Sequence, residues 1–187
     1  MEREPSEDEG VSSKPLRLIP PPLVYVAAFA LGLLIEKWAP SSGLLVSSGG
    51  RPATALRLLA GLSIAVGIAL GPLNAVRFLL RGTTLNPNAP ATLFLTEGIY
   101  GLSRNPMYLG LFFIYFGVAV VTAKLWPFAT MIIPILVMDR VVVPFEEGQM
   151  VQRFGAAYLE YCSRVRRWFP LGTPKSPVAS DLLGSKD

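Results

Sequence analysis

The sequence predicts an all-α membrane protein: a polytopic helical bundle with about four transmembrane helices and a C-terminal helix at the cytosolic surface. Of the 187 residues, 51% are hydrophobic and only 16% are charged, and the mean hydropathy is +0.46. Soluble domains carry about 25% charged residues. The apolar residues gather in long runs, and a helix of about 20 apolar residues spans a bilayer. Composition and clustering therefore both favour a membrane bundle.

The first apolar run covers residues 23–38. Three prolines at 20–22 precede it, and proline is tolerated at a helix start, where its missing N–H has no intrahelical partner. Trp38 ends the run, in the place where an interfacial aromatic side chain is expected. The segment 41–52 that follows is rich in Gly and Ser and predicts a loop.

The second run, residues 53–80, contains glycines and a proline within its apolar sequence. Gly61, Gly67 and Gly71 would let the backbone of another helix approach closely. Pro72 has no N–H to donate, so Gly71 and Pro72 together predict a kink. We therefore expect a long, bent span that packs tightly against a neighbour.

The third and fourth runs, residues 106–123 and 125–145, are separated only by Lys124. So short a connection predicts a tight antiparallel hairpin. A further helix is expected over residues 146–164, because apolar side chains recur there at helical spacing. These side chains are Met150, Val151, Phe154, Tyr158 and Tyr161.

The chain is expected to form one membrane domain over residues 16–170, between polar, disordered tails at 1–15 and 171–187. Four spans would place both termini on the same side. That side, with the loop after the second run, would hold 13 of the Lys and Arg residues, and the other side would hold 4. The positive-inside rule therefore predicts that both termini face the cytosol.

The residue inventory excludes several kinds of chemistry. The chain has no histidine and a single cysteine, Cys162. An imidazole base, an intrachain disulfide and a cysteine- or histidine-based metal site are therefore excluded. We expect no metal and, because the net charge of +4 comes from residues that flank apolar runs, no nucleic acid partner. Cys162 itself is interpreted as a small packing residue, since no histidine can activate it.

A polar stretch, GIYGLSRNPMYLG at residues 98–110, stands directly before the third run. Asn105 is predicted to cap this helix through its side-chain oxygen, and Pro106 suits the first helical position. A capped helix start explains these two residues without any function. It does not explain Tyr100, Arg104 and Tyr108 beside them.

A second polar cluster, Asp139, Arg140, Glu146 and Glu147, closes the fourth run. Ionisable residues at membrane depth are costly, and they usually pair or line a cavity. The predicted hairpin would bring this cluster beside the polar stretch, at the cytosolic face. An interfacial ion pair and a solvated helix turn are the alternatives for these residues. The five residues after the last helical pattern predict an interfacial anchor near anionic lipid: Arg164, Arg166, Arg167, Trp168 and Phe169.

The segment 92–170 contains, in order, LTEGIYGLSRNPMYLG, a predicted hairpin, FEE, RFGAAYLEYCSRV and a closing Pro170. In these pieces it resembles the catalytic region of the isoprenylcysteine carboxyl methyltransferase family, which is akin to the phospholipid N-methyltransferases. The resemblance implies a small bundle of membrane helices that uses S-adenosylmethionine, with a catalytic region at residues 85–170. Residues 1–85 match only as generic spans.

The resemblance also implies roles for particular residues. It implies a catalytic group of Arg104, Arg140 and Glu146. It implies a cofactor site formed by Thr92, Leu93, Phe94, Leu95, Tyr100, Asn105, Pro106, Met107, Tyr108, Glu146 and Glu147. One departure is that eukaryotic members of the family have histidine at the position of Asn105. An asparagine offers a donor and an acceptor but no charge near neutral pH.

The acceptor implied is a lipophilic small molecule or a lipid-anchored substrate, taken from the membrane. A carboxylate of an isoprenylcysteine-like compound is favoured, because a carboxylate needs no base and only a cation to orient it. A phospholipid amine, deprotonated with help from Glu146 or Glu147, and a small thiol are the alternatives. A membrane reductase of the sterol type and a non-catalytic membrane protein are hypotheses of other classes.

Overall fold

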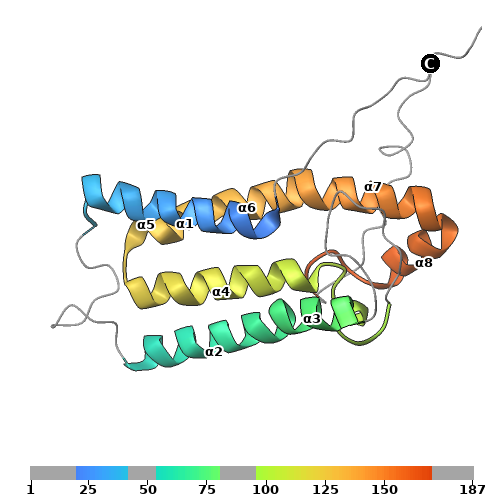
Figure 1. Ribbon diagram of the computed structural model, residues 1–187, viewed down its shortest axis with the longest axis horizontal. Helices are drawn as coiled ribbons and strands as arrows, with labels where there is room; N and C mark the ends of the chain where they lie inside the picture. The colour runs from blue at the N-terminus through green and yellow to red at the C-terminus, as the bar shows by residue number, and fades with distance from the viewer. Residues whose placement is uncertain (1–19, 42–53, 81–95, 170–187) are drawn as a thin grey trace, which may run out of the picture.

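The computed structural model describes residues 20–41, 54–80 and 96–169, of which 77–80 are described by their backbone alone (Figure 1). Throughout these ranges the regular elements are helices, as the sequence predicts. The two predicted tails, Thr92 to Leu95 and Pro170 lie outside the described residues. The helices are α1 (Pro21–Trp38), α2 (Thr54–Leu70), α3 (Pro72–Leu80), the short 3₁₀ helix η1 (Gly98–Gly101), α4 (Pro106–Thr122), α5 (Leu125–Thr130), α6 (Ile132–Val137), the π-helical turn η2 (Met138–Val142), α7 (Val143–Phe154) and α8 (Ala156–Arg164).

The four apolar runs form two layers of elongated helices (Figure 1). In the upper layer of this view α1 lies along α5 and α6, and in the lower layer α2 and α3 lie along α4. Three helical stretches are long and apolar enough to cross a membrane: Pro21–Trp38, Thr54–Val76 and Leu125–Phe154. The fourth apolar helix, Pro106–Thr122, has 17 residues. The predicted polytopic bundle is therefore confirmed.

The last long span runs without a loop from α5 to α7, and its prolines shape it. Pro134 has no N–H for the carbonyl four residues back, so a helical hydrogen bond is missing near Met131, where the backbone itself stays in the right-handed helical region. Pro144 follows the π-helical turn η2, in which the Val143 amide donates to the Met138 carbonyl five residues back. Proline in a membrane helix is accommodated by such local adjustments. Because η2 holds one extra residue, the side chains that follow it point in directions different from those they would have in an uninterrupted α-helix.

The contact between α2 and α4 is made by backbone against backbone. A Cβ added to Gly110 would lie 2.7 Å from the Gly71 Cα, and one added to Gly67 would lie 2.7 Å from the Gly110 carbonyl oxygen. The Ser63 hydroxyl donates to the Phe113 carbonyl at 2.8 Å. The close approach predicted for Gly67 and Gly71 is thus confirmed. It is wrong for Gly61, where an added Cβ would have no neighbouring atom within 4 Å.

The core between the layers consists of buried side chains from α1, α4 and the last long span. Its fully packed members are Tyr25, Ala28, Tyr115, Ala119, Met138 and Val142. At the end of α1 away from the polar stretch, the buried Glu36 carboxylate accepts from the Ser41 amide and hydroxyl at 2.9 and 2.7 Å, and the Ser41 hydroxyl accepts from the Leu125 amide of α5 at 3.0 Å. The Trp126 indole donates to the Ala39 carbonyl at the same end, at 2.6 Å.

The predicted C-terminal helix divides in two. α7 continues the last span to Phe154, and Gly155, with φ 52° and ψ −128°, reverses the chain into α8. A positive φ of this kind favours glycine. The apolar side chains predicted for this region do pack together, around Tyr158, Tyr161, Cys162 and Val165. Cys162 is fully buried there, as expected of a packing residue.

Candidate functional site

The polar stretch before α4 is folded by contacts with the chain that follows α8. The Arg104 amide donates to the Arg166 carbonyl at 2.8 Å. The Ser103 hydroxyl and the Asn105 side-chain amide both donate to the Arg167 carbonyl, at 3.2 and 3.0 Å. The segment 103–105 is therefore held by main-chain carbonyls of residues about 60 positions later in the sequence.

The predicted capping role of Asn105 is wrong. Asn105 does occupy the position before α4, and Pro106 is the first residue of the helix, but the Asn105 side chain makes no capping hydrogen bond. Its side-chain amide is committed instead to the Arg167 carbonyl. Pro106 is buried, and the Met107 carbonyl lies 3.6 Å from the place that a Cβ on Gly71 would occupy.

At the first turn of α4, Tyr108 meets Glu146 on α7. The Tyr108 hydroxyl donates to Glu146 Oε1 at 2.6 Å. This contact joins the two polar clusters across 38 residues of sequence, and so the convergence expected from the hairpin is found here. Tyr25 on α1 donates to the Tyr108 carbonyl at 3.3 Å, which brings a third helix to the same place. Within the described ranges Glu146 makes no ion pair.

Glu147, the next residue, is buried among arginines. Its side chain is 4% exposed and lies 3.2 Å from Arg104 Nη1, which is equally buried. Its second oxygen accepts from Arg167 Nη2 at 2.6 Å. Burial acts to lower the pKa of Arg167, but the hydrogen bond and charge of Glu147, together with Asp139, outweigh it and raise that pKa. The alternative of a solvated helix turn is therefore excluded for Glu147.

Arg140 lies apart from these contacts. Its side chain is 77% exposed and pairs with Asp139 at 3.3 Å, as the interfacial ion-pair alternative describes. The expectation that Arg140 would lie beside Arg104, Asn105 and Tyr108 is not met. The cause is the π-helical turn η2, which changes the direction in which Arg140 points relative to Glu146 and Glu147.

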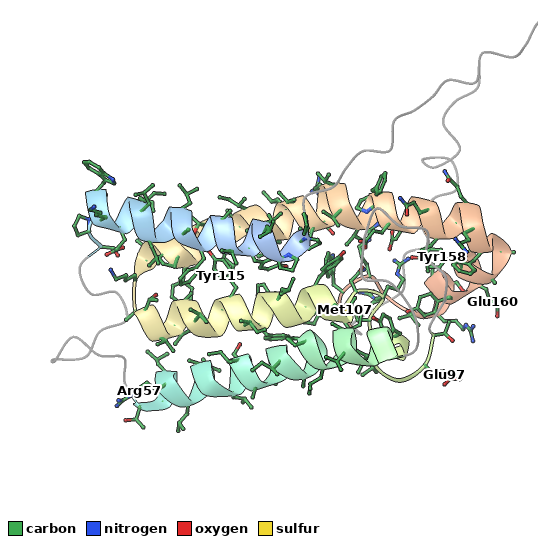
Figure 2. The ribbon with its side chains drawn as sticks, viewed as in Figure 1. Arg57, Glu97, Met107, Tyr115, Tyr158 and Glu160 are labelled. Atoms are coloured by element: carbon green, nitrogen blue, oxygen red, sulfur yellow. The ribbon has the colours of Figure 1, made fainter. Side chains whose placement is uncertain are left out.

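Tyr100, in η1, lies at the same end of the bundle. Its carbonyl accepts from the Tyr161 hydroxyl of α8 at 2.6 Å. Burial and the nearby charge of Glu146 raise the pKa of Tyr100 to about 12. The Tyr100 hydroxyl therefore remains neutral at physiological pH. Figure 2 shows Glu97, Met107, Tyr158 and Glu160 toward this end of the molecule and Arg57 at the other.

Two members of the polar network are missed by the sequence prediction. The pattern predicts an interfacial anchor at Arg167 and Trp168, yet Arg167 binds Glu147, and the Trp168 indole donates to Asp139 at 2.8 Å. The number of acidic residues at the end of the fourth run could have indicated these contacts. Asp139, Glu146 and Glu147 stand close together in an apolar environment, and buried carboxylates need nearby cations.

The site is built from carboxylates, tyrosines, arginines and main-chain carbonyls. Across the part of the chain that the structure describes, no three His, Cys, Asp or Glu side chains are grouped so as to hold a metal ion. Fold and site together define an integral membrane protein with a polar, partly buried cluster at one end of an apolar bundle.

A family model described as phospholipid methyltransferase matches residues 57–157, more than half of the 187 residues. The chain therefore belongs to this family, which is made up of methyltransferases. The match extends from α2 to the first turn of α8 and includes Tyr108, Glu146 and Glu147. No match was found among curated proteins or among solved structures.

Proposed function

We propose that this protein is an integral membrane methyltransferase that uses S-adenosylmethionine to methylate a lipophilic acceptor. The observation that carries the proposal is the Glu146–Tyr108 pair, 2.6 Å apart, at the end of an apolar helical bundle in a chain of this family. A carboxylate that is without an ion pair within the described ranges suits a cationic ligand. The site and both termini are proposed to face the cytosol, on the basis of the 13 to 4 distribution of basic residues.

The residues present fit S-adenosylmethionine, which carries a sulfonium and an ammonium group. Glu146 offers a carboxylate to a positive charge, and aromatic faces such as Tyr108 and Tyr100 attract cations. Tyr100, with its pKa raised to about 12, offers a neutral hydroxyl as donor or acceptor. We propose that Glu146, Tyr108 and Tyr100 hold the cofactor, as the family resemblance implies. Thr92 to Leu95, implied as further cofactor contacts, lie outside the described residues.

Methyl transfer requires the protein mainly to position the two reactants and to exclude water from them. Bound S-adenosylmethionine would supply the methyl group on its sulfonium. Holding two reactants in line can account for about 7–11 kcal/mol of a barrier. Tyr25, Tyr108 and Glu146 come from three different helices and meet at one point, so these helices can fix that geometry. The apolar core beneath them keeps water away from the bundle interior.

For the acceptor, the geometry supports an amine over a carboxylate. A carboxylate acceptor needs a cation that is available beside the Glu146–Tyr108 pair. Arg140 lies apart from that pair, is largely exposed and pairs with Asp139. Arg104 and Arg167 are both paired with Glu147. An amine needs a carboxylate to orient it and to accept its proton, and Glu146 is such a group. We therefore propose a lipid amine headgroup first and the carboxylate of an isoprenylcysteine-like compound second.

The proposal is tested first by cofactor binding in purified protein. Glu146→Gln removes the negative charge, and Tyr108→Phe removes only the hydroxyl. Each is expected to weaken binding of S-adenosylmethionine by about tenfold or more, or about 1.4 kcal/mol, in a calorimetric titration. Glu160→Gln, on an exposed surface of α8, is the control and should bind like the parent protein. Parental affinity in both site variants would refute this assignment of the site.

A screen of acceptors then decides the substrate class. Methyl transfer is measured with phosphatidylethanolamine in vesicles, with a farnesylated cysteine and with an alkyl thiol. We expect transfer to the amine. Transfer only to the farnesylated cysteine would overturn the preference for an amine and leave the methyltransferase assignment standing.

A further inference from the structure

A second polar network beside the Glu146–Tyr108 pair has no part in the proposed chemistry. It is formed between α7, η2 and the strap, by which we mean residues 165–169 after α8. The strap lies beyond residues 57–157, the region that the family model matches. Its contacts suggest what it does for the site.

The main chain of the strap holds the start of α4. The Arg166 carbonyl accepts from the Arg104 amide, and the Arg167 carbonyl accepts from the Ser103 hydroxyl and the Asn105 side-chain amide. Residues 103–105 lead directly into the turn that carries Tyr108. Displacement of the strap would therefore release the segment that aims Tyr108 at Glu146.

The side chains of the strap bind it to the last long span. Arg167 donates to both oxygens of Glu147, at 2.6 and 3.3 Å, and lies 3.7 Å from Asp139. The Trp168 indole donates to Asp139 Oδ1 at 2.8 Å. Hydrogen bonds between charged groups in such fork geometry are stronger and more directional than neutral ones. Two acidic residues on one helix thus share the Arg167 side chain.

The π-helical turn η2 makes this sharing possible. Each residue advances about 100° around an α-helix, so a residue seven positions on returns to within about 20° of the same face, whereas one eight positions on lies about 80° away. An uninterrupted helix would therefore align Asp139 with Glu146. The one extra residue of η2 aligns Asp139 with Glu147 instead. Asp139 and Glu147 consequently face the strap together, while Glu146 faces Tyr108.

We propose that Asp139 and Arg167 are positioning residues that clamp the strap onto η2 and α7 and so hold residues 103–105, and through them Tyr108, in place for methyl transfer. The role of Tyr108 in this inference rests on the proposed function. The clamp itself does not, because it is defined by the contacts of the strap.

The experiment compares two readouts in purified full-length variants. One is the rate of tryptic cleavage after Arg166, followed by mass spectrometry, which reports release of the strap. The other is the dissociation constant of S-adenosylmethionine. The variants are Arg167→Met, Arg167→Lys and deletion of Val141, which removes the extra residue of η2. Arg164→Gln is the control, because Arg164 is exposed and, among the residues that the structure describes, pairs only with Glu160 on its own helix.

We expect Arg167→Met and the Val141 deletion to speed cleavage at least tenfold and to weaken cofactor binding at least tenfold. Arg167→Lys, which can keep one ion pair, should fall between these variants and the parent, and Arg164→Gln should match the parent. Should Arg167→Met fail to fold, Asp139→Asn makes the same test, with an expected threefold change in both readouts, because it removes the charge but keeps an acceptor for Trp168.

Cleavage at the parental rate in Arg167→Met would overturn the clamp. Faster cleavage with unchanged cofactor affinity would overturn the positioning role, and a lysine variant no better than the methionine variant would overturn the ion-pair argument. If the parent protein itself binds no S-adenosylmethionine, the proposed function fails and the positioning role fails with it. The cleavage rates then still decide whether the clamp holds the strap.

Discussion

Replacement of Glu147 by Gln is expected to destabilise the protein more than any other single charge removal in the polar network. Glu147 is 4% exposed and contacts two arginines, of which Arg104 is equally buried. The substitution removes the negative charge that lies 3.2 Å from the buried Arg104 guanidinium. A glutamine can still accept one hydrogen bond, but it supplies no charge.

The magnitude follows from the burial of the two partners. Removing one member of a buried ion pair costs about 3–5 kcal/mol. The contact with Arg167 is left out of this figure, because Arg167 keeps Asp139 at 3.7 Å after the substitution and a glutamine can still accept its hydrogen bond. For a chain of this size each kcal/mol lowers the unfolding temperature by about 2–4 °C, so we expect a decrease of roughly 6–20 °C.

Unfolding can be measured through the reactivity of Cys162, since it is the chain's single cysteine and is fully buried. Its thiol becomes reactive toward a fluorogenic maleimide as the protein unfolds in detergent. Glu160→Gln is the control: its side chain is 71% exposed, and a change within about 0.5 kcal/mol is expected. Joint replacement of Arg104 and Glu147 by Leu should recover much of the loss, because it leaves no unpaired charge. A parental unfolding temperature in Glu147→Gln would contradict this account of the buried pair.

Three further outcomes are expected. Gly110→Ala should lower the unfolding temperature, because its Cβ would meet the Gly71 backbone, whereas Gly61→Ala, with open space around it, should not. In a Cys162→Ser background, cysteines placed at the exposed positions 124 and 160 should be labelled from opposite sides of the membrane, the first from outside; labelling of both from one side would contradict the topology. Stability should fall as pH rises from about 10 to about 12, because Tyr100 keeps its proton in the folded state while the unfolded chain loses it, and Tyr100→Phe should reduce this fall in a pH-dependent unfolding series.

The sequence predicts the helices well because their signals are local. The four apolar runs and the proline at the start of α4 occupy nearly the expected residues in the structure. The convergence of Tyr108 and Glu146 also follows from the sequence, because a hairpin with a one-residue connection leaves its two far ends side by side.

The errors arise where a long-range contact replaces a local one. Asn105 has the sequence context of a helix cap, but a carbonyl 62 residues away takes its side-chain amide. Arg167 has the context of a lipid anchor, but it meets Glu147 because Gly155 reverses the chain. The π-helical turn, which separates Arg140 from the cluster, depends on how Pro144 is accommodated, and spacing alone does not reveal that.

For the lipid acceptor proposed above, the contact between α2 and α4 would restrict the route to Glu146. Where Gly67 and Gly71 meet Gly110, no layer of side chains separates the helices, so there is nothing that can rotate aside to open a lateral passage. On the opposite side of α4, the helix is met by side chains instead of backbone, among them Tyr25, whose hydroxyl donates to the Tyr108 carbonyl. An acyl or prenyl chain would therefore enter on the α1 side. Substitution of Tyr25, but not of the glycines, is expected to change the preference for tail length.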